Sequence, residues 1–194
     1  MRYTRGDGLI ENYLARKRAK LVDKLIPEKL RDGKILDIGC GSYPLFLEKT
    51  TFREKHGVDK GLSCEAENIL FRQIDIAKQG LPYGDHSFNL VTLIAVIEHF
   101  TEDKIVEVFK EIDRVLHPEG LILVTTPTPR GDKVLMPMAA LGIVSKEEVR
   151  EHLDGGITEE DMKMYLRNAE LEYKTMRSGR FEFGMNAWYK IEKK

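Results

Sequence analysis

Apolar residues recur every three or four positions over residues 9–26, with polar residues between them. This spacing predicts an amphipathic helix that ends near Pro27. We therefore expect residues 1–27 to form an N-terminal helical segment. Three basic residues accompany the predicted helix: Arg16, Arg18 and Lys20. For such charges a solvated helix face is the expected setting, in preference to a ligand-binding cluster.

Short apolar runs then alternate with stretches of helical periodicity. Strands are predicted at residues 34–38, 56–59, 69–75, 88–94 and 121–125. Helices are predicted from Pro44, which suits a first helical turn, and over residues 101–116. Residues 117–120 are predicted to be a turn. Strands separated by helices in this way predict a parallel sheet with helices on both faces.

The last third of the chain has a different pattern. Residues 127–157 combine prolines and glycines with an apolar patch. A helix is predicted over residues 158–169, because Thr158 is a good N-cap and Asp161 places an acid in the first turn. Alternation over the remaining residues predicts two strands that form an antiparallel hairpin, with a turn at Ser178-Gly179.

The strongest chemical signal lies where the first predicted strand ends, in Asp37-Ile38-Gly39-Cys40-Gly41. Glycines in such a turn let the backbone approach a ligand closely, and ligands of parallel α/β sheets lie at the carboxyl ends of the strands. Asp59 follows at the end of the second predicted strand. A carboxylate at that distance suits the binding of ribose hydroxyls. Taken alone, Asp59 is better explained as a loop acid that caps the next segment, but the glycine turn upstream favours ribose binding.

Together these residues resemble the class I S-adenosylmethionine-dependent methyltransferases, in particular the small type-11 group, over most of the chain. The resemblance implies a single Rossmann-like α/β domain over residues 1–194. Its sheet would be mainly parallel and seven-stranded, with helices on both faces and a C-terminal antiparallel hairpin.

The resemblance also implies S-adenosylmethionine as the cofactor and assigns residues to its parts. The glycine turn would hold the methionine part, Asp59 with Lys60 beside it the ribose, and Asp75 with Ile76 the adenine. The exit of the fourth strand would pass near the cofactor. The implied cofactor-binding residues are Asp37, Gly39, Cys40, Gly41, Asp59, Lys60, Asp75, Ile76, Ile94 and Ala95. The sequence departs from the family pattern at Tyr43, where a third glycine is common, and at Asn89, where an aspartate is usual.

The implied function is methyl transfer to an acceptor, which we expect to be a small molecule. Such a reaction depends mainly on proximity and orientation, so it needs no catalytic triad, and none is visible. Two alternatives stay open: a non-catalytic, methyltransferase-like binding subunit, and an NAD-dependent enzyme. The NAD fingerprint fits less well, because its third glycine would fall at Pro44.

Residues for the acceptor are harder to assign. His99 follows the fourth strand, and His152 resembles a histidine that family members carry before the last helix. Residues 127–157 resemble insertions that cover the acceptor pocket, in which Met136 and Met138 would form an adaptable apolar lid. A helix packed on the core, or a dimer contact, is an equal interpretation of this insertion.

Composition narrows the function classes. Lys and Arg number 31 against 32 Asp and Glu, a net charge of −1, so no basic excess favours nucleic acid or an anionic membrane. The two cysteines form no CxxC pair, and we expect no metal site. No apolar run reaches the roughly 20 residues of a membrane helix, and no signal peptide is visible. A cytoplasmic location is therefore expected.

Overall fold

The structure is a computed structural model that describes residues 9–61, 66–129 and 156–194. Its strands are β1 (Lys34–Ile38), β2 (Glu54–Asp59), β3 (Leu70–Gln73), β4 (Phe88–Ile94), β5 (Leu116–Pro127), β6 (Tyr173–Phe181) and β7 (Asn186–Lys193). Its helices are α1 (Leu9–Leu25), α2 (Leu45–Lys49), α3 (Glu102–Val115) and α6 (Glu159–Asn168), with short 3-10 turns η1 (Glu28–Leu30), η2 (Ile97–His99) and η3 (Glu182–Gly184).

All seven strands join one sheet in the order β3-β2-β1-β4-β5-β7-β6. Strands β1 to β5 are parallel, and β7 runs antiparallel to both β5 and β6. The carboxyl ends of β1, β4 and β5 therefore meet at one edge of the sheet, which the start of β7 also reaches. The expected Rossmann-like sheet with a C-terminal antiparallel hairpin is confirmed.

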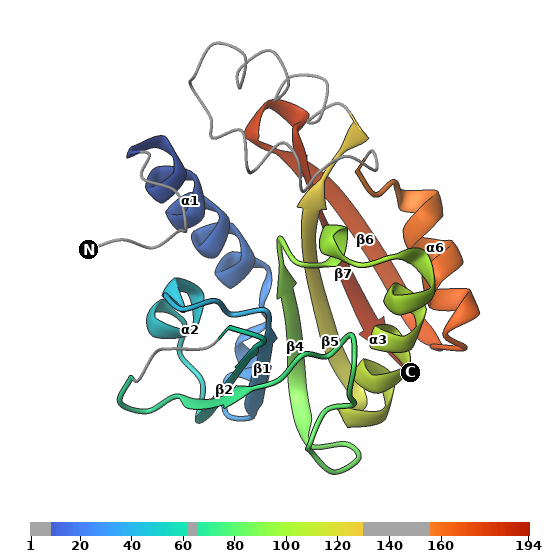
Figure 1. The fold of residues 1–194 in the computed structure, drawn as a ribbon, viewed down its shortest axis with the longest axis horizontal. Helices are drawn as coiled ribbons and strands as arrows, with labels where there is room; N and C mark the ends of the chain where they lie inside the picture. Colours follow the sequence, from blue (N-terminus) through green and yellow to red (C-terminus); the bar gives the residue numbers. More distant parts are fainter. Residues whose placement is uncertain (1–8, 62–65, 130–155) are drawn as a thin grey trace.

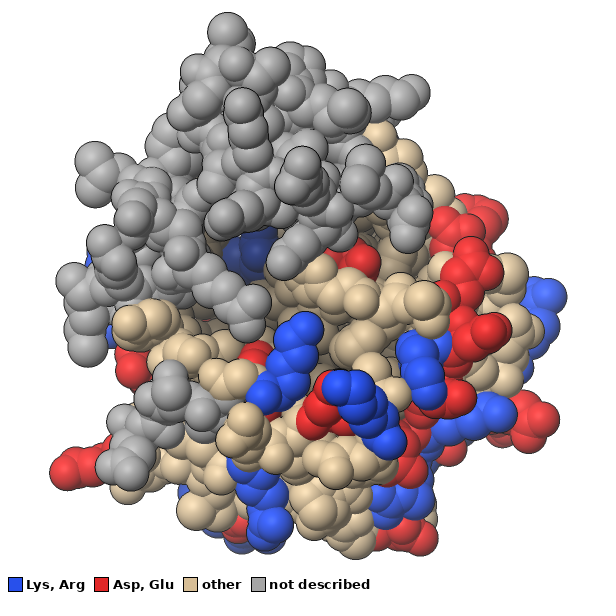
Figure 2. All heavy atoms as spheres, in the orientation of Figure 1, with Lys and Arg blue, Asp and Glu red and all other residues tan. Residues whose placement is uncertain are grey.

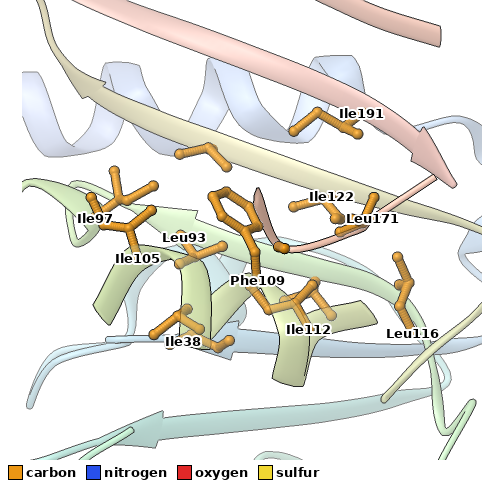
Figure 3. Packing of buried hydrophobic residues seen from close by; sticks show 14 of the residues in the cluster. Ile38, Leu93, Ile97, Ile105, Phe109, Ile112, Leu116, Ile122, Leu171 and Ile191 are labelled. Atoms are coloured by element: carbon orange, nitrogen blue, oxygen red, sulfur yellow. The ribbon is translucent and has the colours of Figure 1, made fainter. Parts of the chain in front are cut away.

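Helices cover both faces of the sheet (Figure 1). On one face, Val22 of α1 and Leu47 of α2 pack with Ile35 and Leu123 of the strands. On the other face, α3 and α6 pack on the alternate side chains. Figure 3 shows Phe109 at the centre of that second cluster. Burying a side chain of this size contributes about 2 to 3 kcal/mol, so these two apolar layers fix the sheet between them.

Most predicted elements are confirmed. The bounds of β1 and β4 agree with the predicted ones, and α3 and α6 differ from theirs by one residue at each end. Thr158 caps α6: its hydroxyl accepts a hydrogen bond from the Asp161 amide, and the Asp161 carboxylate accepts one from the Thr158 amide. Residues 117–119, predicted to lie in a turn, belong to β5 but are exposed beside an irregularity in its pairing with β4.

The predicted position of the hairpin turn is wrong. Ser178 and Gly179 lie inside β6, and the chain reverses at η3 instead. A Cβ at Gly179 would lie 2.7 Å from the indole ring of Trp188 on β7. The glycine therefore makes room for a neighbouring ring and does not form a turn.

Asn89, the departure from the family pattern before β4, has a structural explanation. Its side-chain oxygen accepts a hydrogen bond from the Lys34 amide at 2.9 Å, which ties the start of β1 to β4. A Cβ at Gly33 would overlap this side chain. The asparagine and the glycine therefore form one contact at the amino end of the sheet, away from the glycine turn.

Candidate functional site

The turn after β1 is fixed by the backbone. The amides of Gly39 and Cys40 both donate to the carbonyl of Val58 on β2, at 2.7 and 3.2 Å. Gly39 and Gly41 have φ angles of +74° and +67°. That left-handed region costs other residues about 1 to 2 kcal/mol, which explains glycine at both positions.

The two glycines meet very different surroundings. A Cβ at Gly39 would lie 2.4 Å from a methyl group of Val96, so the turn is packed tightly on that side. Apart from its two chain neighbours, a Cβ at Gly41 would meet no described atom nearer than the Tyr43 amide nitrogen at 4.0 Å. Tyr43 itself is 48% exposed and leaves this space open. The turn therefore offers bare backbone to a ligand at Gly41.

Asp59, at the end of β2, connects two loops. Its carboxylate accepts hydrogen bonds from the amide of Gly41 at 3.0 Å and from the amide of Gly61 at 2.8 Å. The Ser42 hydroxyl donates to the Gly61 carbonyl at 3.3 Å and joins the same loops again. We call the Asp59 carboxylate, with the Gly41 and Gly61 amides that it binds, the cradle. Each carboxylate oxygen can accept more than one hydrogen bond, so the cradle can still accept hydrogen bonds from ligand hydroxyls.

Asp37 is the buried acid of the site. It is 4% exposed, and its carboxylate accepts a hydrogen bond of 2.6 Å from the Thr92 hydroxyl on β4. Burial raises the pKa of Asp37 to about 7; the Thr92 bond opposes the rise and the Asp59 charge adds to it. This acid therefore exchanges its proton near neutral pH, directly below the glycine turn.

Asp75 and Ile76 follow β3 on the same side of the site. The Asp75 carboxylate accepts from the Ala77 amide at 3.2 Å and pairs with Lys78 at 2.9 Å. Its pKa lies below the usual range, first because of the Lys78 hydrogen bond, and the Lys60 charge contributes. Ile76 is half-buried against the core. The structure thus brings Asp75 into the neighbourhood of Lys60.

The exit of β4 brings further predicted residues to this edge. Ile94 is half-buried beside the α1 cluster, and Ala95 has a φ of +56°. The Ala95 amide donates to the Thr125 carbonyl at 2.9 Å, which fixes the bend. His99 is exposed in η2 just beyond it.

Other predicted residues are less informative. Met136, Met138 and His152 lie outside the described residues, as does most of the 127–157 insertion. Its described ends lie together, since the Ile157 amide donates to the Pro127 carbonyl at 3.2 Å. Cys40 is buried, and a Cβ at Gly57 would lie 2.8 Å from its sulfur, so this side chain packs between the strands.

Sequence reasoning missed two neighbours of the turn. Thr92 binds Asp37, and its signal was a lone hydroxyl inside the apolar run of residues 90–94. Val96 closes one side of the turn over Gly39. Nothing in the local sequence distinguishes Val96 from the other apolar residues of that stretch.

Comparison with known proteins shows the family to which this chain belongs. Residues 10–175 match the family described as the methyltransferase domain. The chain belongs to this family. A search of curated proteins by sequence finds no match.

Solved structures share the fold of this methyltransferase. The PH0226 protein of Pyrococcus horikoshii is 23% identical with a TM-score of 0.68, covering 99% of this chain and 95% of that one. An S-adenosylmethionine-dependent methyltransferase of Mesorhizobium loti is 16% identical with a TM-score of 0.64, covering 90% and 96%. A Haloferax volcanii protein solved in complex with the Trm112 methyltransferase activator is 15% identical with a TM-score of 0.67, covering 96% and 94%.

S-adenosylmethionine is the cofactor of this methyltransferase, and the resemblance to class I enzymes is confirmed. The glycine turn fits such a group, because the space over Gly41 is open and the Asp59 carboxylate borders it. Within the residues that the structure describes, no helix is long and apolar enough to cross a membrane.

Proposed function

We propose that this methyltransferase is an active enzyme that transfers the methyl group of S-adenosylmethionine to a small-molecule acceptor. The observation that carries the proposal is the open left-handed turn at Gly41, whose amide shares the Asp59 carboxylate with a second loop. A backbone surface of this kind, at the carboxyl edge of a parallel sheet, suits an elongated nucleoside ligand.

In this proposal, different residues of the site bind different parts of the cofactor. The turn from Gly39 to Gly41, above Asp37, holds the methionine part. Asp59 accepts hydrogen bonds from the ribose hydroxyls, with Lys60 beside it. Asp75 and Ile76 receive the adenine, and Ile94 and Ala95 line the path towards the acceptor. The half-buried Ile76 offers apolar surface to the ring, and the Asp75 carboxylate offers acceptors to its amino group.

The chemistry asked of these residues is modest. The cofactor supplies an activated methyl group on its sulfonium. The chain holds that group in line with the acceptor atom and excludes water, so proximity and orientation supply most of the rate. No broad basic area covers the described part of the face in Figure 2, which favours a small molecule over a nucleic acid as the acceptor.

Calorimetry tests the cofactor half of the proposal. We expect S-adenosylmethionine and S-adenosylhomocysteine to bind the wild-type chain, and NAD not to bind. Gly41→Ala should fold but bind S-adenosylhomocysteine at least tenfold more weakly, because its Cβ would enter the open space. Binding of NAD alone, or of no nucleoside at all, would refute the proposal.

A radioactive methyl group tests the acceptor half. The enzyme is incubated with methyl-labelled S-adenosylmethionine and a cell extract divided by filtration into small molecules and macromolecules. Label in the small-molecule fraction supports the proposal, whereas label in the macromolecular fraction alone would replace the small acceptor by a macromolecular one.

A non-catalytic subunit is the second candidate. It is favoured by the Haloferax volcanii neighbour, which was solved together with a methyltransferase activator. Tight cofactor binding without transfer to either fraction would support it, as would transfer that appears only after a partner protein is added. The cytoplasmic location stays a prediction.

A further inference from the structure

The tip between β6 and β7 has an unusual backbone. Three consecutive residues, Glu182, Phe183 and Gly184, have φ angles of +51°, +57° and +83°. Such angles are uncommon for residues other than glycine, and strain of this kind gathers where a ligand is bound. The Phe183 side chain is fully exposed, so no burial of its ring compensates for the conformation.

Hydrogen bonds from Thr128, directly after β5, and from Asn186 on β7 hold this tip in place. The Thr128 hydroxyl donates to the Gly184 carbonyl at 2.8 Å, and the Thr128 amide donates to the Met185 carbonyl at 2.8 Å. The Asn186 amide group donates to one carboxylate oxygen of Glu182, Oε2, at 2.6 Å. These contacts fix the Glu182 side chain while its neighbour Phe183 points outwards.

The second carboxylate oxygen, Glu182 Oε1, is buried and has no hydrogen-bond partner among the described residues. The same is true of Arg18 Nε on α1. Buried polar atoms are nearly always paired with protein or water, so two such atoms of opposite character require an explanation.

These two side chains are neighbours. Burial raises the pKa of Glu182, and the Arg18 charge is the first influence that opposes this rise, ahead of the Asn186 bond, with Lys17 contributing less. Yet no ion pair within 4.0 Å joins Arg18 to Glu182 in the described chain. The fixed tip and the packed helix α1 thus hold a guanidinium and a carboxylate close together without direct contact.

The pair lies at the same edge of the sheet as the glycine turn. Ile38 of β1 pairs with Leu93 of β4, Ile94 with Thr125 of β5, and Pro127 with Asn186 of β7. Three strand spacings, about 14 Å in all, therefore separate the turn from the hairpin tip. A cofactor and a small acceptor side by side can span this distance.

The pair also lies on the same face as the turn. The Lys190 ammonium donates to the Leu25 carbonyl of α1, and Asn186 precedes Lys190 by four residues on β7, so both face α1. Asp37 follows Ile35, which packs against α1, by two residues and faces the same way.

We propose that Arg18 and Glu182 form a recognition subsite that binds a hydroxyl group of the acceptor. Arg18 Nε donates to the hydroxyl oxygen, and Glu182 Oε1 accepts the hydroxyl proton. A hydroxyl completes both hydrogen bonds, whereas an ammonium group meets repulsion from Arg18 and a carboxylate meets repulsion from Glu182. The subsite rests on the proposed function, because it would bind the acceptor of the same methyl transfer. Arg18 thereby differs from the solvated charge that its sequence context predicts.

A matched pair of small probes tests the subsite. Phenol carries a hydrogen on its oxygen where anisole carries a methyl group, and their binding is measured by ligand-observed nuclear magnetic resonance with and without S-adenosylhomocysteine. We expect wild-type protein to bind phenol about tenfold more tightly than anisole, as one hydrogen bond to a charged group implies. Glu182→Gln should reduce this preference to less than about threefold, and Arg18→Met should weaken the binding of both probes, because Arg18 Nε donates to the oxygen that phenol and anisole share.

Lys20→Met serves as the control, because it removes an exposed charge two residues from Arg18 on the same helix. It should keep the full preference for phenol. Glu182→Gln keeps an oxygen for Asn186, and Arg18→Met leaves the tip untouched, so one variant stays informative if the other unfolds.

Failure of the subsite and of the proposed function give different results. Equal binding of phenol and anisole by wild-type protein, or binding of neither, overturns the subsite even when S-adenosylhomocysteine binds. A preference for phenol that survives Glu182→Gln overturns it as well, as does unchanged binding of both probes by Arg18→Met. Absence of S-adenosylhomocysteine binding refutes the proposed function, while the phenol preference is read independently from the samples without it.

Discussion

At the β1–β2 end of the sheet's carboxyl edge, backbone amides and the Asp59 carboxylate join two loops by hydrogen bonds, whereas at the β5–β7 end two buried atoms, Glu182 Oε1 of the strained tip and Arg18 Nε of α1, have no hydrogen-bond partner among the described residues. Gly41, Gly61 and Asp59 satisfy each other in the first region. Arg18 and Glu182 do not in the second. In our proposal, the cofactor is the same in every turnover and binds a turn whose own hydrogen bonds are already complete. The acceptor binds side chains whose remaining hydrogen bonds its hydroxyl group completes.

Gly39→Ala should break the first region most severely. The new Cβ would lie 2.4 Å from Val96 at a φ of +74°, and left-handed strain plus overpacking together cost about 2 to 5 kcal/mol. For a chain of this size that lowers the melting temperature by roughly 4 to 20 °C, measurable by calorimetry.

Gly84→Ala is the matched control for this substitution. Its Cβ would meet nothing nearer than the Ser87 hydroxyl at 3.6 Å, so its stability should stay within about 0.5 kcal/mol of wild type. If the two variants melt together, the close packing of Gly39 under Val96 does not exist.

Asp37→Asn should act in the opposite direction and depend on pH. The unfolded chain loses this proton near the usual aspartate pKa of 3.8, and the folded chain keeps it until its pKa of about 7. The folded form binds more protons between these values, so wild-type stability falls as the pH rises from 4 to 7. Asparagine removes this loss, which amounts to about 4 kcal/mol at pH 8.

Urea unfolding at several pH values measures this effect. The variant should exceed wild type most at pH 8, and its advantage should shrink steadily towards pH 4. An advantage that is independent of pH would show that Asp37 is not the group that holds the proton.

Asp59→Asn should reduce binding more than stability. The asparagine keeps the size of the side chain but loses the charge, and its NH2 group cannot accept from one of the two amides, Gly41 or Gly61, that the carboxylate binds. Hydrogen bonds to a charged group contribute about 2 kcal/mol, so S-adenosylhomocysteine should bind roughly 30-fold more weakly by calorimetry. Asp103→Asn, an exposed change in the first turn of α3, should leave the affinity unchanged. Equal affinities of the two variants would remove Asp59 from the cofactor site.

Sequence reasoning succeeded where local signals agree with the tertiary structure. The bounds of β1 follow from an apolar run between Gly33 and Gly39, and the glycine turn is specified within a few residues. The hairpin turn was misplaced because Ser178-Gly179 is a strong local turn signal. Gly179 instead accommodates Trp188, nine residues later and on another strand.

The acceptor side could not be predicted in the same way. Arg18 and Glu182 are 164 positions apart, and each looks like an ordinary surface charge in its own segment. Only the sheet order, which places β7 beside β5, and the packing of α1 bring them together. Sequence motifs therefore predict the cofactor half of the edge, and the three-dimensional structure is needed to propose the other half.

Phe183→Gly should give the smallest effect and sharpen the contrast between the two regions. The ring is fully exposed at a φ of +57°, so its removal forfeits no burial. Relief of left-handed strain exceeds the entropy cost of glycine slightly, and we expect a gain in stability of less than about 1 kcal/mol by urea unfolding. A loss of stability would mean that the ring packs against the chain and that the tip is not strained. A small gain would instead show that the hairpin tip carries backbone strain in the folded chain. The glycine turn avoids this strain, because its left-handed positions are glycines.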